Sequence, residues 1–180
     1  MSDDAIPVRL LAILGSLGAR SSNRTLLERA RDLAPDGVDV AVFDSLGALP
    51  FFDPDLDPEG APHTVLALRR AIAESDALVI ACPEYGFSLP GVLKNAIDWL
   101  IGSGELERKV IAITASVPHA ERGRKGLAAL RQTLSAVSAQ VPFDRPIARG
   151  DGEDAAIRDL LTRTIAPARI ARDTIASQEN

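Results

Sequence analysis

Cysteine and histidine are scarce in this sequence, and their scarcity excludes two kinds of structure. Cys82 is the one cysteine among 180 residues, and the two histidines are His63 and His119. A single cysteine excludes a disulfide within the chain, and no group of cysteines and histidines has the spacing of a metal site. We therefore expect neither a disulfide-stabilised scaffold nor a metal centre.

An excess of positive charge and a membrane-length apolar run are also missing. The chain has 20 lysines and arginines against 25 acidic residues, a formal net charge of −5. This balance argues against nucleic acid as a partner, because no basic face is available to displace counterions. Residues 1–11 contain no apolar segment like that of a secretory signal. We expect a soluble cytoplasmic protein and, because 46% of its residues are hydrophobic, one domain spanning residues 1–180.

Two well-known phosphate-binding motifs are absent as well. No G-x-x-x-x-G-K-[ST] occurs, and the spacing of Gly15 and Gly18 does not make G-x-G-x-x-G. These absences argue against a nucleoside-triphosphate loop and a dinucleotide fingerprint. What remains suits a single phosphate, as in a mononucleotide.

A candidate anion site is nevertheless present between residues 10 and 30. An apolar run, 10–14, is followed by a small, hydroxylated loop and then by apolar residues at helical spacing. A strand, a polar loop and a helix in this order place free N–H groups and the positive end of the helix at the loop. Arg20 and the hydroxyls of Ser16, Ser21 and Ser22 can add hydrogen bonds to phosphate. An ordinary serine-rich turn remains the alternative.

The rest of the chain alternates between strand-like and helix-like segments. The alternation predicts an α/β fold with a parallel sheet covered on both faces, in strand order 2-1-3-4-5. The expected strands are 8–14, 38–43, 77–81, 110–114 and 141–148. The expected helices are one that follows the first loop and runs to about 33, then about 63–74, 91–101 and 123–137, and one from about 153 onward. Ligands bind such sheets at the carboxyl ends of the strands, which directs attention to loops 15–23, 82–90 and 115–122.

Proline disfavours helix in two places. Four prolines four residues apart predict that loop 44–62 is not helical. Its Phe51 and Phe52 fit either an apolar plug over the sheet edge or a lid or subunit-contact element. Pro167 is expected to kink or break the last helix.

The stretch 82–100 reads CPEYGFSLPGVLKNAIDWL. Together with Gly15-Ser16-Leu17, Ser21 and Asn23, the block Pro83-Glu84-Tyr85 followed by PGVLKNAIDW resembles the NADPH-dependent FMN reductase family over roughly residues 8 to 150. That family includes quinone, chromate and azo-dye reductases. The resemblance implies a flavodoxin-like three-layer sandwich with a five-stranded parallel sheet.

The resemblance also implies the residues of a flavin site. They are Ser16, Ser21 and Asn23 in the phosphate loop, Pro83, Glu84 and Tyr85 along the isoalloxazine edge, and Ser116 in the third flavin loop. Three departures stand out. Gly18 replaces the usual arginine, whose charge Arg20 could supply, and Gly86 replaces the usual asparagine. After Ser116 the chain reads VPHAERGRKG instead of a glycine-rich run.

The function implied by the resemblance is transfer of hydride and electrons from NAD(P)H through bound FMN to a flavin, a quinone or a similar acceptor. The flavin carries the chemistry, so no catalytic side chain is expected. The resemblance also implies a homodimer or homotetramer. The alternatives are a flavodoxin-type electron carrier, against which the aromatic content of 4% argues mildly, and a nucleotide-binding regulator without turnover.

Overall fold

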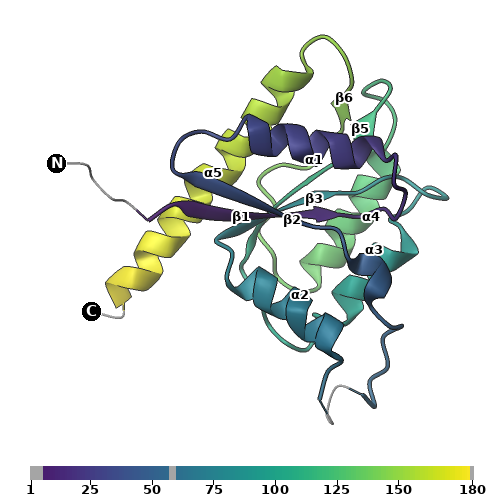
Figure 1. The fold of residues 1–180 in the computed structure, drawn as a ribbon, viewed down its shortest axis with the longest axis vertical. Helices are drawn as coiled ribbons and strands as arrows, with labels where there is room; N and C mark the ends of the chain where they lie inside the picture. Colours follow the sequence, from purple (N-terminus) through teal and green to yellow (C-terminus); the bar gives the residue numbers. More distant parts are fainter. Residues whose placement is uncertain (1–5, 57–59, 179–180) are drawn as a thin grey trace.

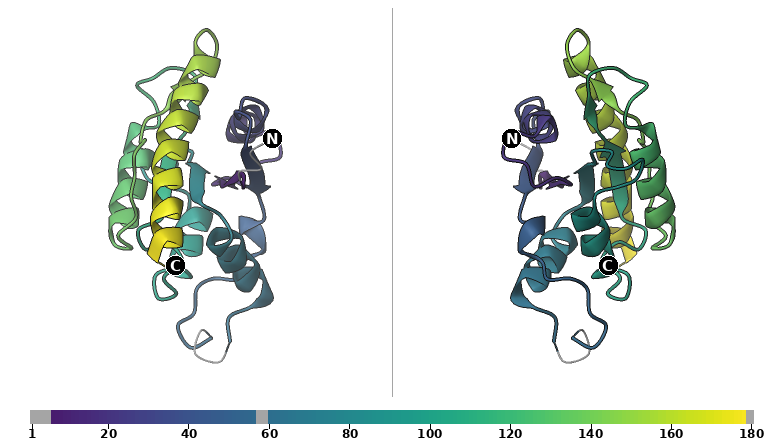
Figure 2. Two further views of the ribbon diagram at one scale, coloured as in Figure 1. Left: turned by 90° about the vertical axis from the view of Figure 1, so that its left-hand side faces the viewer. Right: turned by 90° about the vertical axis from the view of Figure 1, so that its right-hand side faces the viewer.

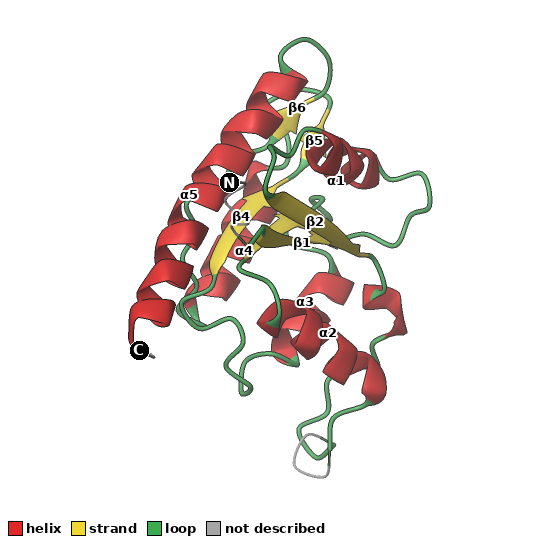
Figure 3. Cartoon of the chain, turned by 60° about the vertical axis from the view of Figure 1, so that its left-hand side comes forward, coloured by secondary structure: helices red, strands yellow, loops and turns green. Residues whose placement is uncertain are grey.

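The computed structural model describes residues 6–56 and 60–178. Its main sheet has four parallel strands in the order β2-β1-β3-β4. The strands are β1 (Val8–Leu14), β2 (Val38–Phe43), β3 (Ala77–Ala81) and β4 (Val110–Thr114), all with the expected bounds. A second, two-stranded sheet pairs β5 (Ser116–Val117) with β6 (Ile147–Ala148), and Figure 3 shows it just past the end of β4.

The expected fifth strand is interrupted. Segment 140–148 runs beside β4 through isolated bridges, Val110 to Gln140 and Ile113 to Asp144, before it forms β6. Between the two bridges the chain advances three residues along β4 but four along the segment, so the segment contains one extra residue, a bulge. Pro142 and Pro146 have no N–H to donate, so a continuous ladder cannot form there. The strand order is as predicted, but the fifth position is held by a bulged segment.

Helices cover both faces of the sheet, and the alternation of side chains along the strands explains why. Leu11 and Ile13 point into one apolar cluster, while Leu10, Ala12 and Leu14 point into another. The first cluster is closed by α2 (His63–Ala73), α3 (Gly91–Asp98) and α4 (Arg124–Ser135), and the second by α1 (Ser22–Asp32) and α5 (Glu153–Gln178). Figure 1 shows α1 on one side of the sheet and α2 and α3 on the other. The fold is a three-layer sandwich.

The structure corrects two expectations about helices: loop 44–62 contains a helical turn, and Pro167 does not break the last helix. Loop 44–62 contains a short 3₁₀ helix, η1 (Leu46–Ala48), whose Leu46 is buried in the core beside α3. Helix α5 continues through Pro167 and runs along one side of the sheet (Figure 2). Ile165 and Ala168 are buried on either side of the proline, and this packing outweighs the loss of one backbone hydrogen bond.

Helix α3 ends at Asp98, earlier than expected, and Trp99 follows it completely buried. Its indole Nε1 donates to the carbonyl of Pro50 at 3.0 Å, and Phe52 packs edge-on against its ring. Trp99 is thus a packing residue, and it anchors the start of the long loop, whose Phe51 stays exposed. Among the helices of the described residues, none is long and apolar enough to cross a membrane.

Candidate active site

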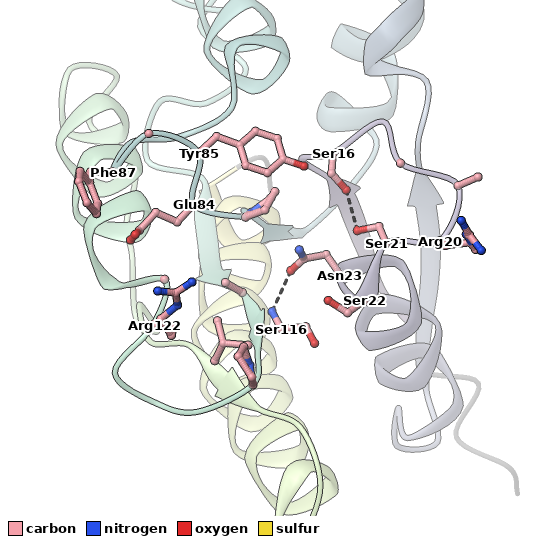
Figure 4. Close-up of a pocket in the computed structure, with 18 residues that line it drawn as sticks. Ser16, Arg20, Ser21, Ser22, Asn23, Glu84, Tyr85, Phe87, Ser116 and Arg122 are labelled. Atoms are coloured by element: carbon pink, nitrogen blue, oxygen red, sulfur yellow. Dashed lines mark hydrogen bonds between the residues drawn. The ribbon is translucent and has the colours of Figure 1, made fainter.

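Three loops meet at the carboxyl ends of β1, β3 and β4 and enclose a cleft of about 890 Å³. Figure 4 shows side chains from all three loops around it. Every residue that the sequence assigns to the flavin site lines this cleft: Ser16, Arg20, Ser21, Asn23, Pro83, Glu84, Tyr85, Gly86 and Ser116. The fold therefore gathers residues that lie up to a hundred positions apart into one place.

The first wall is the loop between β1 and α1. Ser16 is buried, and its hydroxyl donates to the hydroxyl of Ser21 at 2.8 Å. Ser21 is the N-cap residue of α1, yet its side chain makes no capping hydrogen bond. In the described part of the chain, the N–H groups of Ser22 and Asn23 donate to no acceptor. These donors, at the positive end of a helix, are available to an anion in the cleft.

Arg20 is the cation of this wall. Its side chain is exposed, and its guanidinium has no hydrogen bond or ion pair with any residue that the structure describes. In Figure 4 it extends from the end of the loop that lies away from Ser116. At Gly18 a Cβ would have no neighbour within 4 Å, so the family's usual arginine would fit there. The loop carries its charge two residues later instead.

The third wall is loop 115–122, which follows β4, and one buried hydrogen bond joins it to the first wall. The backbone N–H of Ser116 donates to Oδ1 of Asn23 at 2.8 Å, and both residues are at least nine-tenths buried. The hydroxyl of Ser116 is buried as well, but it has no hydrogen-bond partner. An unsatisfied hydroxyl in a cleft wall costs free energy unless a ligand completes it.

The second wall is a tight hairpin turn. Tyr85 and Ser88 exchange two backbone hydrogen bonds of 3.0 Å, and the two residues between them have positive φ, 56° at Gly86 and 62° at Phe87. Two positive values in a two-residue turn are characteristic of type I′. Tyr85 is exposed at the cleft, whereas the carboxylate of Glu84 turns toward α4 and accepts the N–H groups of Lys125 and Gly126.

Phe87 and Arg122 carry the largest side chains among the cleft-lining residues that sequence reasoning did not assign to the site. Arg122 closes a turn in which its N–H donates to the carbonyl of His119 at 3.1 Å, and Figure 4 shows its side chain beside Glu84 and Ser116. Its guanidinium has no carboxylate partner among the described residues. The available signal was the departure from a glycine-rich run after Ser116, which introduces charged residues into this loop.

The remaining candidates for chemistry do not face the cleft. Burial and the nearby charge of Glu84 raise the pKa of Cys82 to about 12, so this thiol is neutral and unreactive at pH 7. His119 is exposed and pairs with Glu121 at 3.2 Å, as expected of a solvated loop histidine. The described residues contain no cluster of three potential metal ligands. The cleft thus offers hydrogen-bond donors and positive charge, without a nucleophile or a metal site.

Comparisons with known proteins agree with this geometry. Residues 8–152 match the family described as NADPH-dependent FMN reductase. An NAD(P)H-dependent FMN reductase of Pseudomonas aeruginosa is 38% identical over 150 residues, which cover 81% of this chain and 77% of that protein. A quinone reductase of Escherichia coli is 36% identical over 137 residues, covering 74% and 73%.

Solved structures extend the likeness to the whole fold. The flavoenzyme FerB of Paracoccus denitrificans, an NAD(P)H:acceptor oxidoreductase, superposes with a TM-score of 0.74 at 26% identity and covers 90% of this chain and 96% of its own. The match over residues 8–152 includes all three loops of the cleft. The chain belongs to the NADPH-dependent FMN reductase family.

Proposed function

We propose that the cleft binds FMN and that the protein passes electrons from NAD(P)H through it to a quinone or another small acceptor. The observation that carries this proposal is the set of unpaired donors in one cleft. The N–H groups of Ser22 and Asn23 lie at one wall, and the buried hydroxyl of Ser116 lies at another. A phosphate at the first wall would accept from the two N–H groups, and a polar atom of the flavin ring would accept from the Ser116 hydroxyl.

The phosphate end of the proposed site is the loop between β1 and α1. The Ser21 hydroxyl and the free N–H groups supply neutral donors, and Arg20 supplies a charged one, whereas the Ser16 hydroxyl already donates to Ser21. The hydrogen bond between the hydroxyls of Ser16 and Ser21 holds the loop closed in advance. A loop ordered before binding loses little conformational freedom when phosphate arrives, which favours tight binding.

The ring end is formed by loops 82–90 and 115–122. Bound FMN would supply the chemistry itself, acceptance of hydride from a nicotinamide and delivery of electrons to an acceptor. Pro83, Tyr85 and Gly86 would contact the ring mostly through backbone atoms and the tyrosine face, and the Ser116 hydroxyl would donate to a polar atom of the ring. Because no side chain of the cleft needs to act as acid or base, we assign no catalytic residue.

Arg122 suits the second substrate. Its unpaired guanidinium lies on the opposite wall from Arg20, so the cleft has a cation on each side. FMN has one phosphate group, which the first wall can hold. We assign Arg122 to the phosphates of the nicotinamide dinucleotide, because a guanidinium binds phosphate through charged hydrogen bonds.

The experiment that tests this function begins with the absorption spectrum of the purified protein. A flavin band near ~450 nm shows bound FMN. NADPH oxidation with and without a quinone then separates an enzyme from an electron carrier, which binds flavin but turns over slowly. A regulator on the same fold would be colourless and inactive. Ser116→Ala should weaken FMN binding, whereas Ser135→Ala, at an exposed hydroxyl at the end of α4, serves as the matched control.

Two finer features belong to the same proposal. We place the protein in the cytoplasm, where NAD(P)H is available. We also infer a homodimer or homotetramer, because several large apolar side chains are exposed near the cleft and on the long loop: Leu17, Phe51, Phe52, Tyr85 and Phe87. A neighbouring subunit would cover them and the open face of the flavin.

A further inference from the structure

The side chain of Glu84 is bound to helix α4. Its Oε2 accepts the N–H of Lys125 at 2.9 Å and that of Gly126 at 3.0 Å. Helix α4 begins at Arg124, so both N–H groups belong to its first turn, where the helix has no carbonyl to offer them. Its N-cap residue, Gly123, has no side chain to serve as a cap. Glu84 therefore caps α4 from a different element, and its negative charge is favoured at this end of the helix.

Helix and loop also approach one another closely at Gly126. A Cβ on this residue would lie 3.0 Å from the Cα of Glu84 and 3.2 Å from the carbonyl oxygen of Ser88. Such distances are shorter than most Cβ contacts in proteins, so a side chain here would require the neighbouring backbone to shift slightly, and glycine permits the contact. The hairpin turn of loop 82–90 consequently rests directly on the first turn of α4.

A third contact holds the tip of the turn. The Nζ of Lys125 lies 3.9 Å from the centre of the Phe87 ring, an attractive cation–π arrangement. Phe87 has a φ of 62°, a strained value for a bulky residue, and the residue is 69% exposed, so core burial does not offset the strain. Backbone strain of this kind persists where surrounding contacts fix the conformation, and it is common at ligand sites.

We propose that Glu84 is a positioning residue that sets the distance between the second and third walls of the cleft. We call the three contacts between the turn and α4 the clasp; its residues are Glu84, Phe87, Lys125 and Gly126. The third loop leads directly into α4, so the clasp fixes the backbone of Pro83–Gly86 relative to the loop that carries Ser116 and Arg122. In this inference, which rests on the proposed function, the carboxylate acts on FMN only through the backbone that it holds.

The test compares Glu84→Ala with Glu84→Gln in the full-length protein. Alanine removes the acceptor and should weaken FMN binding about 10-fold or more, the effect of losing charged hydrogen bonds. Glutamine keeps an amide oxygen that can accept both N–H groups, and it should restore most of the affinity. Glu74→Ala, at an exposed glutamate at the end of α2, is the control that leaves binding unchanged. The measurement is FMN affinity from quenching of flavin fluorescence, together with the visible spectrum of the bound flavin.

A second variant leaves the carboxylate in place. Gly126→Ala should push the turn away from α4, weaken FMN binding and change the bound-flavin spectrum in the same direction as Glu84→Ala. If Glu84→Gln binds FMN as poorly as Glu84→Ala, the carboxylate acts on the ligand by its charge, and the positioning role is wrong. Unchanged affinity in Glu84→Ala also overturns it. A wild-type protein that binds no FMN would instead refute the proposed function.

Discussion

Arg20 supplies the positive charge of the first wall of the cleft, where we propose that phosphate binds. The loop carries glycine at position 18, and the remaining donors of the wall are neutral. Ser16 and Ser21 are engaged with one another, so each hydroxyl has limited freedom to turn toward a ligand. The charge of the bound phosphate would therefore be balanced by the helix dipole and by one guanidinium.

Replacing Arg20 by alanine should lower FMN affinity by about 1.5–3 kcal/mol, the typical contribution of a charged hydrogen bond. The affinity is measured by titrating the apoprotein with FMN and following flavin fluorescence. Arg24→Ala is the matched control, because Arg24 pairs with Asp44 at 2.9 Å outside the cleft lining. An unchanged affinity in Arg20→Ala would mean that this side chain stays in solvent and that the helix end and hydroxyls suffice.

Gly86 is the first central residue of the hairpin turn, where its φ is 56° and a Cβ would meet nothing within 4 Å. Asparagine tolerates this conformation, so Gly86→Asn should bind FMN as tightly as the wild type or more tightly. Gly86→Val should weaken binding, because a β-branched residue is strained at positive φ. FMN dissociation, followed by recovery of free-flavin fluorescence, compares the three proteins. Equally tight binding by the valine variant would show that loop 82–90 does not touch the ring.

Cys82 should be inert in the folded protein. Its pKa of about 12 exceeds its ordinary value of 9.0, because burial and the charge of Glu84 disfavour the thiolate. In the unfolded chain the thiol ionises first as pH rises, so the free energy of unfolding should fall between about pH 9 and 12, by at most about 1.4 kcal/mol per pH unit. Thiol-reagent labelling at pH 8, with and without denaturant, checks the burial. Denaturant unfolding of the wild type and Cys82→Ala across this pH range checks the slope.

Rapid labelling of the native state would contradict the burial of the thiol. If both proteins lose stability equally with pH, Cys82 is not the group responsible.

At the scale of elements, the four regular strands follow from the sequence, because short apolar runs between turn residues carry a strong signal. The irregular pairing of the fifth strand does not follow from the sequence. Pro142 and Pro146 have no N–H to donate, but whether this interrupts the hydrogen bonding depends on how the segment pairs with β4. The nine site residues could be named because the small, hydroxylated loop 15–23 and the block 83–99 each carry a recognisable pattern, and the family resemblance adds Ser116. Phe87 and Arg122 lie in loops without periodicity, and the bonds from Glu84 to α4 join residues 41 and 42 positions apart. Only the folded chain shows such contacts.

Helix α5 tolerates Pro167 at a cost that a substitution can reveal. Pro167→Ala restores an N–H that can donate to the carbonyl of Arg163, four residues earlier. The proline penalty inside a helix is ~3 kcal/mol, partly offset because proline also restricts the unfolded chain, so the net gain in stability should be about 2 kcal/mol. Urea unfolding measures it. A variant no more stable than the wild type would indicate that α5 already relaxes around the proline without loss.

At the scale of the whole molecule, the exposed apolar side chains are the feature that bears on assembly. Phe51 is 89% exposed and Phe87 is 69% exposed, while Trp99 is fully buried. In the proposed homodimer or homotetramer, we therefore expect the contact to involve the exposed phenylalanines and not the tryptophan.

Light scattering at micromolar concentration should give a mass at least twice that of the 19.1 kDa chain. Phe51→Asp should shift the distribution toward the monomer, because a charge at a contact is costly to bury. Ile170→Asp, on the exposed side of α5, is the matched control. A wild-type mass close to 19 kDa would rule out the oligomer, and an oligomer unaffected by Phe51→Asp would place the contact elsewhere.

The bulged segment beside β4 also affects whether a strand of another chain can add to the edge of the sheet. An open strand edge is a template on which a foreign strand can add, and β4 is buried along its whole length, an apolar sequence of the kind that aggregates. The segment 140–148 occupies that edge with two prolines and an irregular register. A further strand would therefore find few aligned donors and acceptors there, and we expect this irregular backbone to disfavour fibril-like growth from this side of the sheet.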